Sequence, residues 1–128
     1  MKKALSIIMI LVICLSACAC GLTKTEDAVV GTWKSTYETE NAHFGFSSVG
    51  DVYTNTIELY KGGTGKIYWK NETRNENGSS SSLSWETQDD VINITYSLAG
   101  SDRFEGYIYN AENDTITSAD NKYTFYRQ

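Results

Sequence analysis

Residues that carry enzymatic chemistry are few in this chain of 128 amino acids. His43 is the single histidine, so a serine nucleophile has one possible imidazole base, and no Ser lies in the glycine-flanked turn that exposes such a nucleophile. A zinc site of His and Cys type lacks ligands for the same reason. The segment from Lys61 to Lys66 is rich in Gly, but Ile67 stands where a phosphate-binding loop requires Ser or Thr. We therefore expect no enzyme, no cofactor and no metal.

Acidic residues dominate the charge. Apart from Lys2 and Lys3, the chain carries 9 basic residues against 16 acidic ones, a net charge of −7. This balance disfavours nucleic acid as a partner. Neighbouring carboxylates such as Asp89 and Asp90 could hold calcium loosely, but no Asp-x-Asp-x-Asp-Gly loop is present in the sequence, and we interpret them as turn residues.

The start of the chain has the pattern of an export signal. Lys2 and Lys3 precede an apolar run of 14 residues from Ala4 to Ala17. As a helix this run would span about 21 Å, less than the hydrocarbon core of about 30 Å. It ends in Leu15-Ser16-Ala17-Cys18, which resembles the lipobox of bacterial lipoproteins: an aliphatic residue, two small residues and a Cys.

The lipobox resemblance implies cleavage before Cys18 and a diacylglycerol thioether on its sulfur. We therefore expect a signal peptide over residues 1–17, an acylated tether over 18–27, and attachment to the extracytoplasmic side of a cell membrane. Cys14 follows the bulky Ile13, and Cys20 lacks the aliphatic position, so Cys18 fits best. The alternative is an uncleaved membrane helix, because the apolar stretch extends to Leu22.

From Val29 onward the apolar residues recur with period two, which is typical of β-strands, and no segment after residue 27 has a helical period. Short turns join the segments, so we expect an all-β, antiparallel up-and-down meander of about eight strands, closed into a small barrel over residues 28–128. The expected strands are 33–37, 53–60, 66–70, 83–87, 91–96, 104–109, 115–117 and 122–127, with a glycine turn at 62–65 and a polar loop from Asn71 to Ser82.

The alternation also predicts which side chains face the interior. These are mostly bulky, which favours a filled core: Trp33, Tyr37, Tyr53, Ile57, Leu59, Ile67, Trp69, Leu83, Trp85, Ile92, Ile94, Tyr96, Phe104, Ile108, Tyr123 and Phe125. Tyrosines alternate with them on the outer face, where they either form an interaction surface or only cover the sheet: Tyr60, Tyr68, Tyr107, Tyr109 and Tyr126.

Val30-Gly31-Thr32-Trp33 resembles the Gly-x-Trp signature of lipocalins, and the terminal Tyr-x-x-Tyr-Arg is similar to the end of the small lipocalin-like domains of bacterial lipoproteins. The resemblance covers residues 29–128 and lacks a second, Thr-Asp-Tyr-like motif. It implies that Trp33 closes one end of the barrel and that Arg127 stacks on it. Independently, Arg127 shares a face with Tyr123 and Phe125, where a cation–π contact could accommodate its charge.

The connection from Glu38 to Gly50 carries His43, Phe44 and Phe46, which predicts either a lid or a plug at one barrel end. We expect a non-catalytic module that binds a small apolar or amphipathic molecule. The candidate ligand-binding residues are His43, Phe44, Phe46, Trp69, Trp85 and Tyr96. The alternative is a filled barrel that binds or inhibits an envelope protein through its outer tyrosines or the 71–82 loop.

Overall fold

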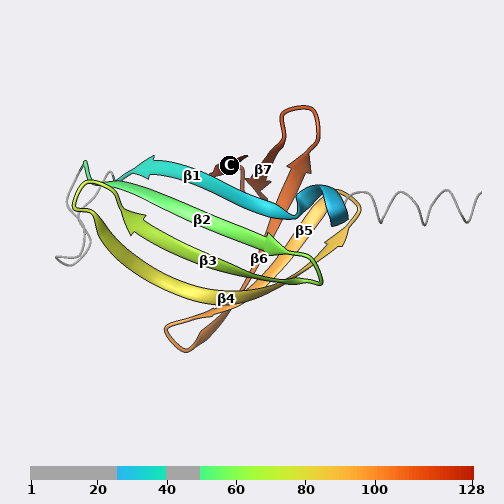
Figure 1. Ribbon diagram of the computed structural model, residues 1–128, viewed down its shortest axis with the longest axis horizontal. Coiled ribbons are helices and arrows are strands. Elements are labelled where there is room, and N and C mark those ends of the chain that lie inside the picture. Colours follow the sequence, from blue (N-terminus) through green and yellow to red (C-terminus); the bar gives the residue numbers. More distant parts are fainter. Residues whose placement is uncertain (1–25, 40–49) are drawn as a thin grey trace, which may run out of the picture.

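The computed structural model describes residues 26–39 and 50–128, and the strands in these residues form one closed antiparallel barrel (Figure 1). Each strand pairs with the next along the chain, and the last pairs with the first. This confirms the predicted up-and-down meander, and the barrel is compatible with a lipocalin-like fold. The strands are β1 (Gly31–Glu38), β2 (Val52–Tyr60), β3 (Thr64–Asn71), β4 (Glu76–Gln88), β5 (Val91–Leu98), β6 (Ser101–Asn110), β7 (Thr115–Ser118) and β8 (Thr124–Arg127).

Several sequence predictions fall outside the described residues. Cys18 lies in the segment 1–25, and His43, Phe44 and Phe46 lie in the segment 40–49. A helical turn over residues 26–29 leads into β1, where the sequence pattern predicted no helix. In the part of the chain that the structure describes, no helix is both long and apolar enough to cross a membrane.

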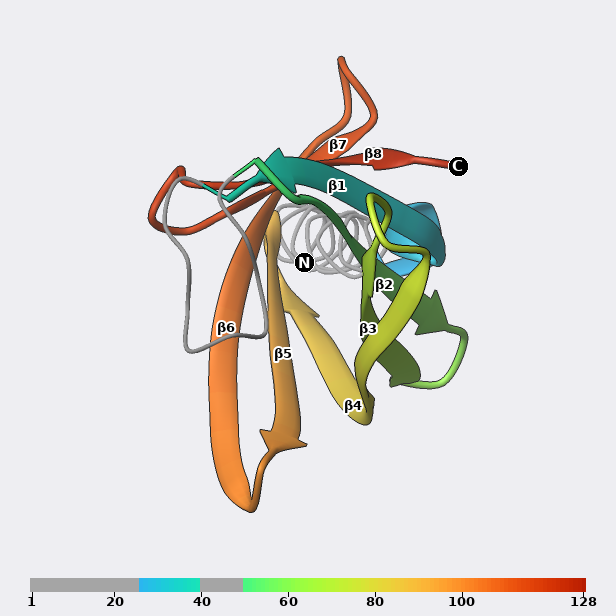
Figure 2. The same cartoon turned by 90° about the vertical axis from the view of Figure 1, so that its left-hand side faces the viewer.

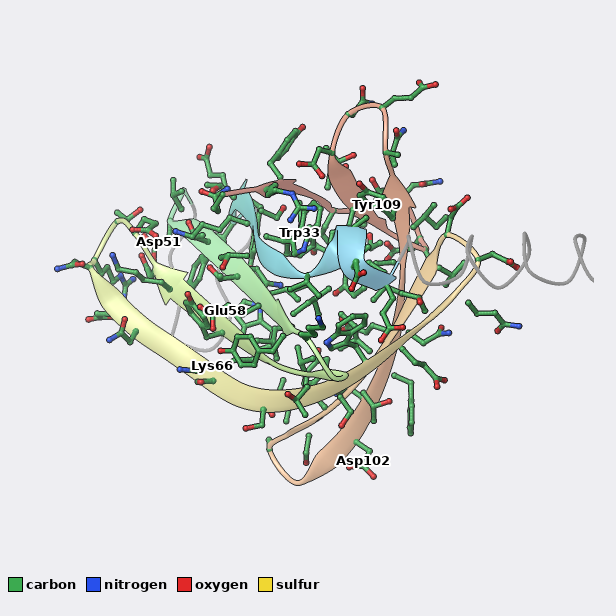
Figure 3. The ribbon with its side chains drawn as sticks, turned by 45° about the vertical axis from the view of Figure 1, so that its right-hand side comes forward. Trp33, Asp51, Glu58, Lys66, Asp102 and Tyr109 are labelled. Atoms are coloured by element: carbon green, nitrogen blue, oxygen red, sulfur yellow. The ribbon has the colours of Figure 1, made fainter. Side chains whose placement is uncertain are left out.

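One end of the barrel is closed by a buried side chain and the helical turn. β1 begins and β8 finishes at this end, which we call the closed end. Here Trp33 is fully buried, and its indole Nε1 donates a hydrogen bond of 2.9 Å to the carbonyl oxygen of Val29 in the helical turn. Its ring meets that of Tyr109 edge to face, with 6.1 Å between centroids, and Figure 3 shows the two side chains close together. The indole and the helical turn thus close this end.

Arg127 makes the contact that the lipocalin resemblance implies. Its guanidinium lies 4.3 Å from the centroid of the Trp33 ring, and the two residues are partners in the β1–β8 register. The guanidinium also donates to the carbonyl oxygens of Val30 and Ala28 and pairs with the Asp114 carboxylate at 2.6 Å. Arg127 therefore ties the last strand to the chain that enters the first.

The polar segment predicted as a loop from Asn71 to Ser82 is mostly strand, so this prediction was wrong. β4 begins at Glu76, and Ser80, Ser81 and Ser82 pair with β3. Serine is a weak strand former, but its backbone groups complete the ladder with β3 regardless of side chain. Asn75 takes a positive φ of 54° and ends the short turn before β4.

The faces of β6 are opposite to those predicted. Phe104 is 77% exposed and Ile108 is 45% exposed, whereas Tyr107 is buried and Tyr109 packs against the core. The predictions of an inward Phe104 and Ile108 and of an outward Tyr107 and Tyr109 were therefore wrong. The cause is the pairing with β5, because Tyr107 lies opposite the buried Ile92, and residues opposite each other share a face of the sheet.

The other predicted inward residues mostly lie in the core. In Figure 2, β2 and β3 stand across the interior from β6, and the β5–β6 hairpin projects beyond the other strands. Tyr123 faces the ring of Tyr37 but remains 38% exposed. The buried hydrophobic residues form one cluster: Val29, Trp33, Ile57, Leu59, Ile67, Leu83, Trp85, Ile92, Ile94, Tyr96, Tyr107, Ile116 and Phe125.

Candidate functional site: an aromatic cavity with an acidic wall

A cavity of about 390 Å³ lies toward the barrel end opposite Trp33, which we call the cavity end. Its volume falls within the range of roughly 300–1,000 Å³ that is usual for small-molecule pockets. The bulky core thus fills the closed end and leaves space at the other. Aromatic side chains from β1, β3, β5, β6, β8 and the turn before β8 line this space, namely Tyr37, Trp69, Tyr96, Phe104, Tyr107, Tyr123 and Phe125.

Ring-to-ring contacts hold this wall in place. The centroids of Trp69 and Tyr96 are 6.2 Å apart. Tyr107 meets Phe125 edge to face at 5.6 Å, and Tyr37 packs at 5.6 Å from Tyr123. Such pairs stabilise a structure beyond their buried area, by about 0.5–1.5 kcal/mol each. Six of the seven lining rings are therefore held by a neighbouring ring, and the seventh, Phe104, is 77% exposed.

Glu105 places a carboxylate in the aromatic wall. One carboxylate oxygen accepts a hydrogen bond of 2.9 Å from the Tyr96 hydroxyl, and the other accepts one of 2.5 Å from Tyr107. Tyr107 shares the inner face of β6 with Glu105, and Tyr96 lies on the neighbouring β5. Burial, followed by the hydrogen bond to Glu105 and its negative charge, raises the pKa of both tyrosines above the ordinary value. Both hydroxyls therefore remain protonated donors at neutral pH.

Asn55 adds an unsatisfied polar atom to the wall. It is the register partner of Trp69, and both side chains line the cavity. The Oδ1 atom of Asn55 is buried and has no hydrogen-bond partner among the residues that the structure describes. Buried polar atoms almost always have a partner, so this oxygen is a site that a donor on a bound molecule or a water can satisfy.

The structure brings only part of the predicted site together. Trp69 and Tyr96 line the cavity, as described above. Trp85 does not, because it lies at the closed end, where its Nε1 donates to the carbonyl oxygens of Tyr60 at 3.1 Å and Thr64 at 2.9 Å. That indole joins β4 to the β2–β3 hairpin.

Of the predicted outer tyrosines, two come together. Tyr60 and Tyr68 both donate a hydroxyl hydrogen bond to Glu58, at 2.5 and 3.2 Å, on the outer face. Sequence reasoning missed Glu105 and Tyr107 because it assigned β6 the opposite faces.

No cluster of three or more His, Cys, Asp and Glu side chains that could hold a metal ion occurs within residues 26–39 and 50–128. Comparisons of the chain with known proteins found no matching protein-family model, no matching curated protein and no matching solved structure.

Alkaline pH is expected to destabilise the fold through Tyr107, whose pKa is raised in the folded protein. Above pH ~10 the unfolded chain releases this hydroxyl proton and the folded protein keeps it. The contribution of Tyr107 to the free energy of unfolding is thus constant below pH ~10. Above that pH it falls, by up to about 1.4 kcal/mol per pH unit.

Urea unfolding of the full chain from about pH 9 to about pH 11, which brackets the ordinary tyrosine pKa, measures this effect. Tyr107→Phe should flatten the fall in stability. Tyr126→Phe is the matched control because Tyr126 is 60% exposed, and it should leave the slope as in the wild type. Equal slopes for all three proteins would contradict the prediction.

Proposed function

We propose that this protein is a membrane-anchored lipoprotein whose barrel binds a small amphipathic molecule without chemical conversion. The observation that carries the proposal is the cavity of about 390 Å³, lined by aromatic rings and a few polar groups. Ligand pockets combine these features, since apolar walls supply affinity and a small number of placed polar groups supply orientation.

The lipobox supports the membrane anchor. Cleavage before Cys18 would leave an acylated cysteine joined to the barrel by the tether of residues 18–27, and more than one acyl chain on that residue is enough for stable attachment. The chain enters the barrel at the closed end, through the helical turn at residues 26–29. The cavity lies at the opposite end, so the fold directs it away from the point where the anchor joins.

Native mass spectrometry of the full chain, expressed with its own signal and released from detergent micelles, tests both parts. We expect a polypeptide that begins at Cys18 and carries diacylglycerol. We also expect an additional mass that disappears on denaturation. Trp69→Leu removes a ring from the cavity wall and should lower the occupancy, whereas Tyr60→Leu removes a ring from the outer face and should not.

A bare acylated polypeptide, unchanged after incubation with a lipid and metabolite extract, would overturn the small-molecule proposal. The outer face at Tyr60, Tyr68 and Glu58 would then be the surface to test for protein partners. An uncleaved, unacylated chain would overturn the lipoprotein proposal independently of the cavity.

A further inference from the structure

We propose that the cavity selects a protonated amine that carries an apolar group, with its ammonium against Glu105 and Asn55 and its apolar part among the rings. This inference rests on the proposed function, since it names the class of ligand that the same cavity takes. It follows from the charge, the hydrogen-bonding capacity and the aromatic content of the wall.

The charged residues that line the cavity are both acidic. They are Glu105 and Asp120, and within the described residues no Lys, Arg or His contributes to the lining. The nearby cations Arg103 and Lys122 are exposed, and the Lys122 ammonium lies 5.9 Å from the centroid of the Tyr123 ring, outside the lining. A carboxylate ligand would therefore meet like charge in the wall, whereas an ammonium ligand would meet opposite charge.

The wall also offers hydrogen-bond acceptors whose capacity is unused. A carboxylate has about four lone-pair sites, and the contacts described above occupy one on each oxygen of Glu105. The hydroxyl protons of Tyr96 and Tyr107 are committed to Glu105, and that of Ser118 is committed to Asp120 at 2.6 Å. Asn55 Oδ1 adds a buried acceptor without a partner in the described part of the chain. A ligand that donates hydrogen bonds can therefore use the remaining lone pairs of Glu105 and the Asn55 oxygen.

Aromatic rings complete the case for a cation. The negative face of a ring attracts an ammonium within about 6 Å, most strongly for Trp, and the effect grows when the cation is desolvated. Trp69 and Tyr96 stand next to each other in the wall, and Tyr96 donates to the Glu105 carboxylate. Aromatic rings and a carboxylate that accepts two tyrosine hydrogen bonds therefore line one cavity, and both groups attract a cation.

Calorimetric titration of the full chain in lipid nanodiscs, with empty nanodiscs as the reference, tests the inference. The probes are 2-phenylethylammonium, the neutral 2-phenylethanol and the anionic 3-phenylpropionate, which are similar in size and differ in charge. We expect the ammonium to bind at least about tenfold more tightly than the alcohol, since a hydrogen bond to a charged group contributes about 1.5–3 kcal/mol. The carboxylate should bind least tightly.

Glu105→Gln should weaken binding of the ammonium by about 10–100-fold and leave the alcohol nearly unchanged. Glu58→Gln is a matched control, because Glu58 also accepts from two tyrosine hydroxyls but lies outside the cavity lining. It makes the same change in net charge and should leave the affinities of all probes as in the wild type.

Equal affinity for the ammonium and the alcohol, or tighter binding of the carboxylate, would overturn the inference and leave the proposed function standing. Failure of all the probes to bind would also overturn it. The comparison on the wild-type protein does not depend on whether a variant folds. The small-molecule part of the proposed function fails only if native mass spectrometry finds no bound small molecule, so the two failures are distinguishable.

Discussion

Replacing Trp33 with Ala is expected to lower the free energy of unfolding by about 3–5 kcal/mol, the usual cost of truncating a large buried aromatic residue. Small domains are stable by only about 5–15 kcal/mol, so this change should remove much of the total. Trp33 is fully buried, and it joins the helical turn, β6 and Arg127 at the closed end. Its removal leaves a void, an unpaired carbonyl at Val29 and a guanidinium without its ring.

Two control variants separate these contributions. Trp33→Phe keeps a ring beneath Arg127 but loses the hydrogen bond to Val29, so it should cost about 1–3 kcal/mol. Trp69→Ala truncates a partly buried indole at the cavity end, where space already exists, and should cost less than Trp33→Ala. Urea unfolding of the full chain, followed by far-ultraviolet circular dichroism, measures all three. A loss of about 0.5 kcal/mol or less for Trp33→Ala, as for a surface substitution, would contradict its role in closing the barrel.

Gly65→Ala is expected to destabilise the barrel by about 3 kcal/mol or more, at the upper end of the range for an overpacked core. A Cβ atom at this position would lie 2.1 Å from the carbonyl oxygen of Glu58 and 2.9 Å from Cδ1 of Leu83. The oxygen belongs to the backbone of β2, the strand that pairs with β3 around Gly65. It cannot move away without opening the β2–β3 ladder.

Gly62→Ala is the matched control for Gly65→Ala. Gly62 has a φ of +98° in the turn, and its Cβ would meet nothing within 4 Å. The cost at Gly62 is therefore backbone strain alone, about 1–3 kcal/mol. Denaturant midpoints of the two variants compare them directly. A larger loss for Gly62→Ala than for Gly65→Ala would show that β2 and β3 do not approach as closely as the structure indicates.

Gly65 also shows how a sequence pattern can be right about an element and wrong about a residue. The sequence Gly62-Gly63-Thr64-Gly65 predicted a hairpin turn, and Gly62 and Gly63 take the positive φ values of 98° and 87° that a turn uses. Gly65 lies in β3 instead, where the close approach of Glu58 and Leu83 excludes a side chain. Which neighbours come close depends on how the strands coil, and no local pattern contains that information.

The cavity was only partly predictable for a related reason. Trp69 and Tyr96 were singled out as bulky inward residues, and both line the cavity. Glu105 was assigned to the outer face with Tyr107, because Phe104 and Ile108 are the more apolar residues of β6 and an apolar residue is expected to face the core. In the structure Tyr107 and Tyr109 face the core. Glu105 lies on the same side of β6 and therefore lines the cavity.

The alternating hydropathy and the turn residues are local features of the sequence. They were enough to predict a closed meander of about eight strands, because each strand must bury one face and short turns join neighbours. The faces of β6 depend on register. Ala99 and Gly100 form the turn, with φ values of 51° and 78°, so Leu98 pairs with Ser101 and Ile94 pairs with Glu105.

A turn one residue longer or shorter would return Phe104 and Ile108 to the core, because a register shift of one residue inverts every side chain of a strand. The packing of Tyr107 on Phe125 and of Tyr109 on Trp33 favours the observed register over that alternative. These are contacts between strands that are distant in the sequence. The acidic wall of the cavity is therefore a consequence of the assembled barrel, which sequence periodicity alone does not contain.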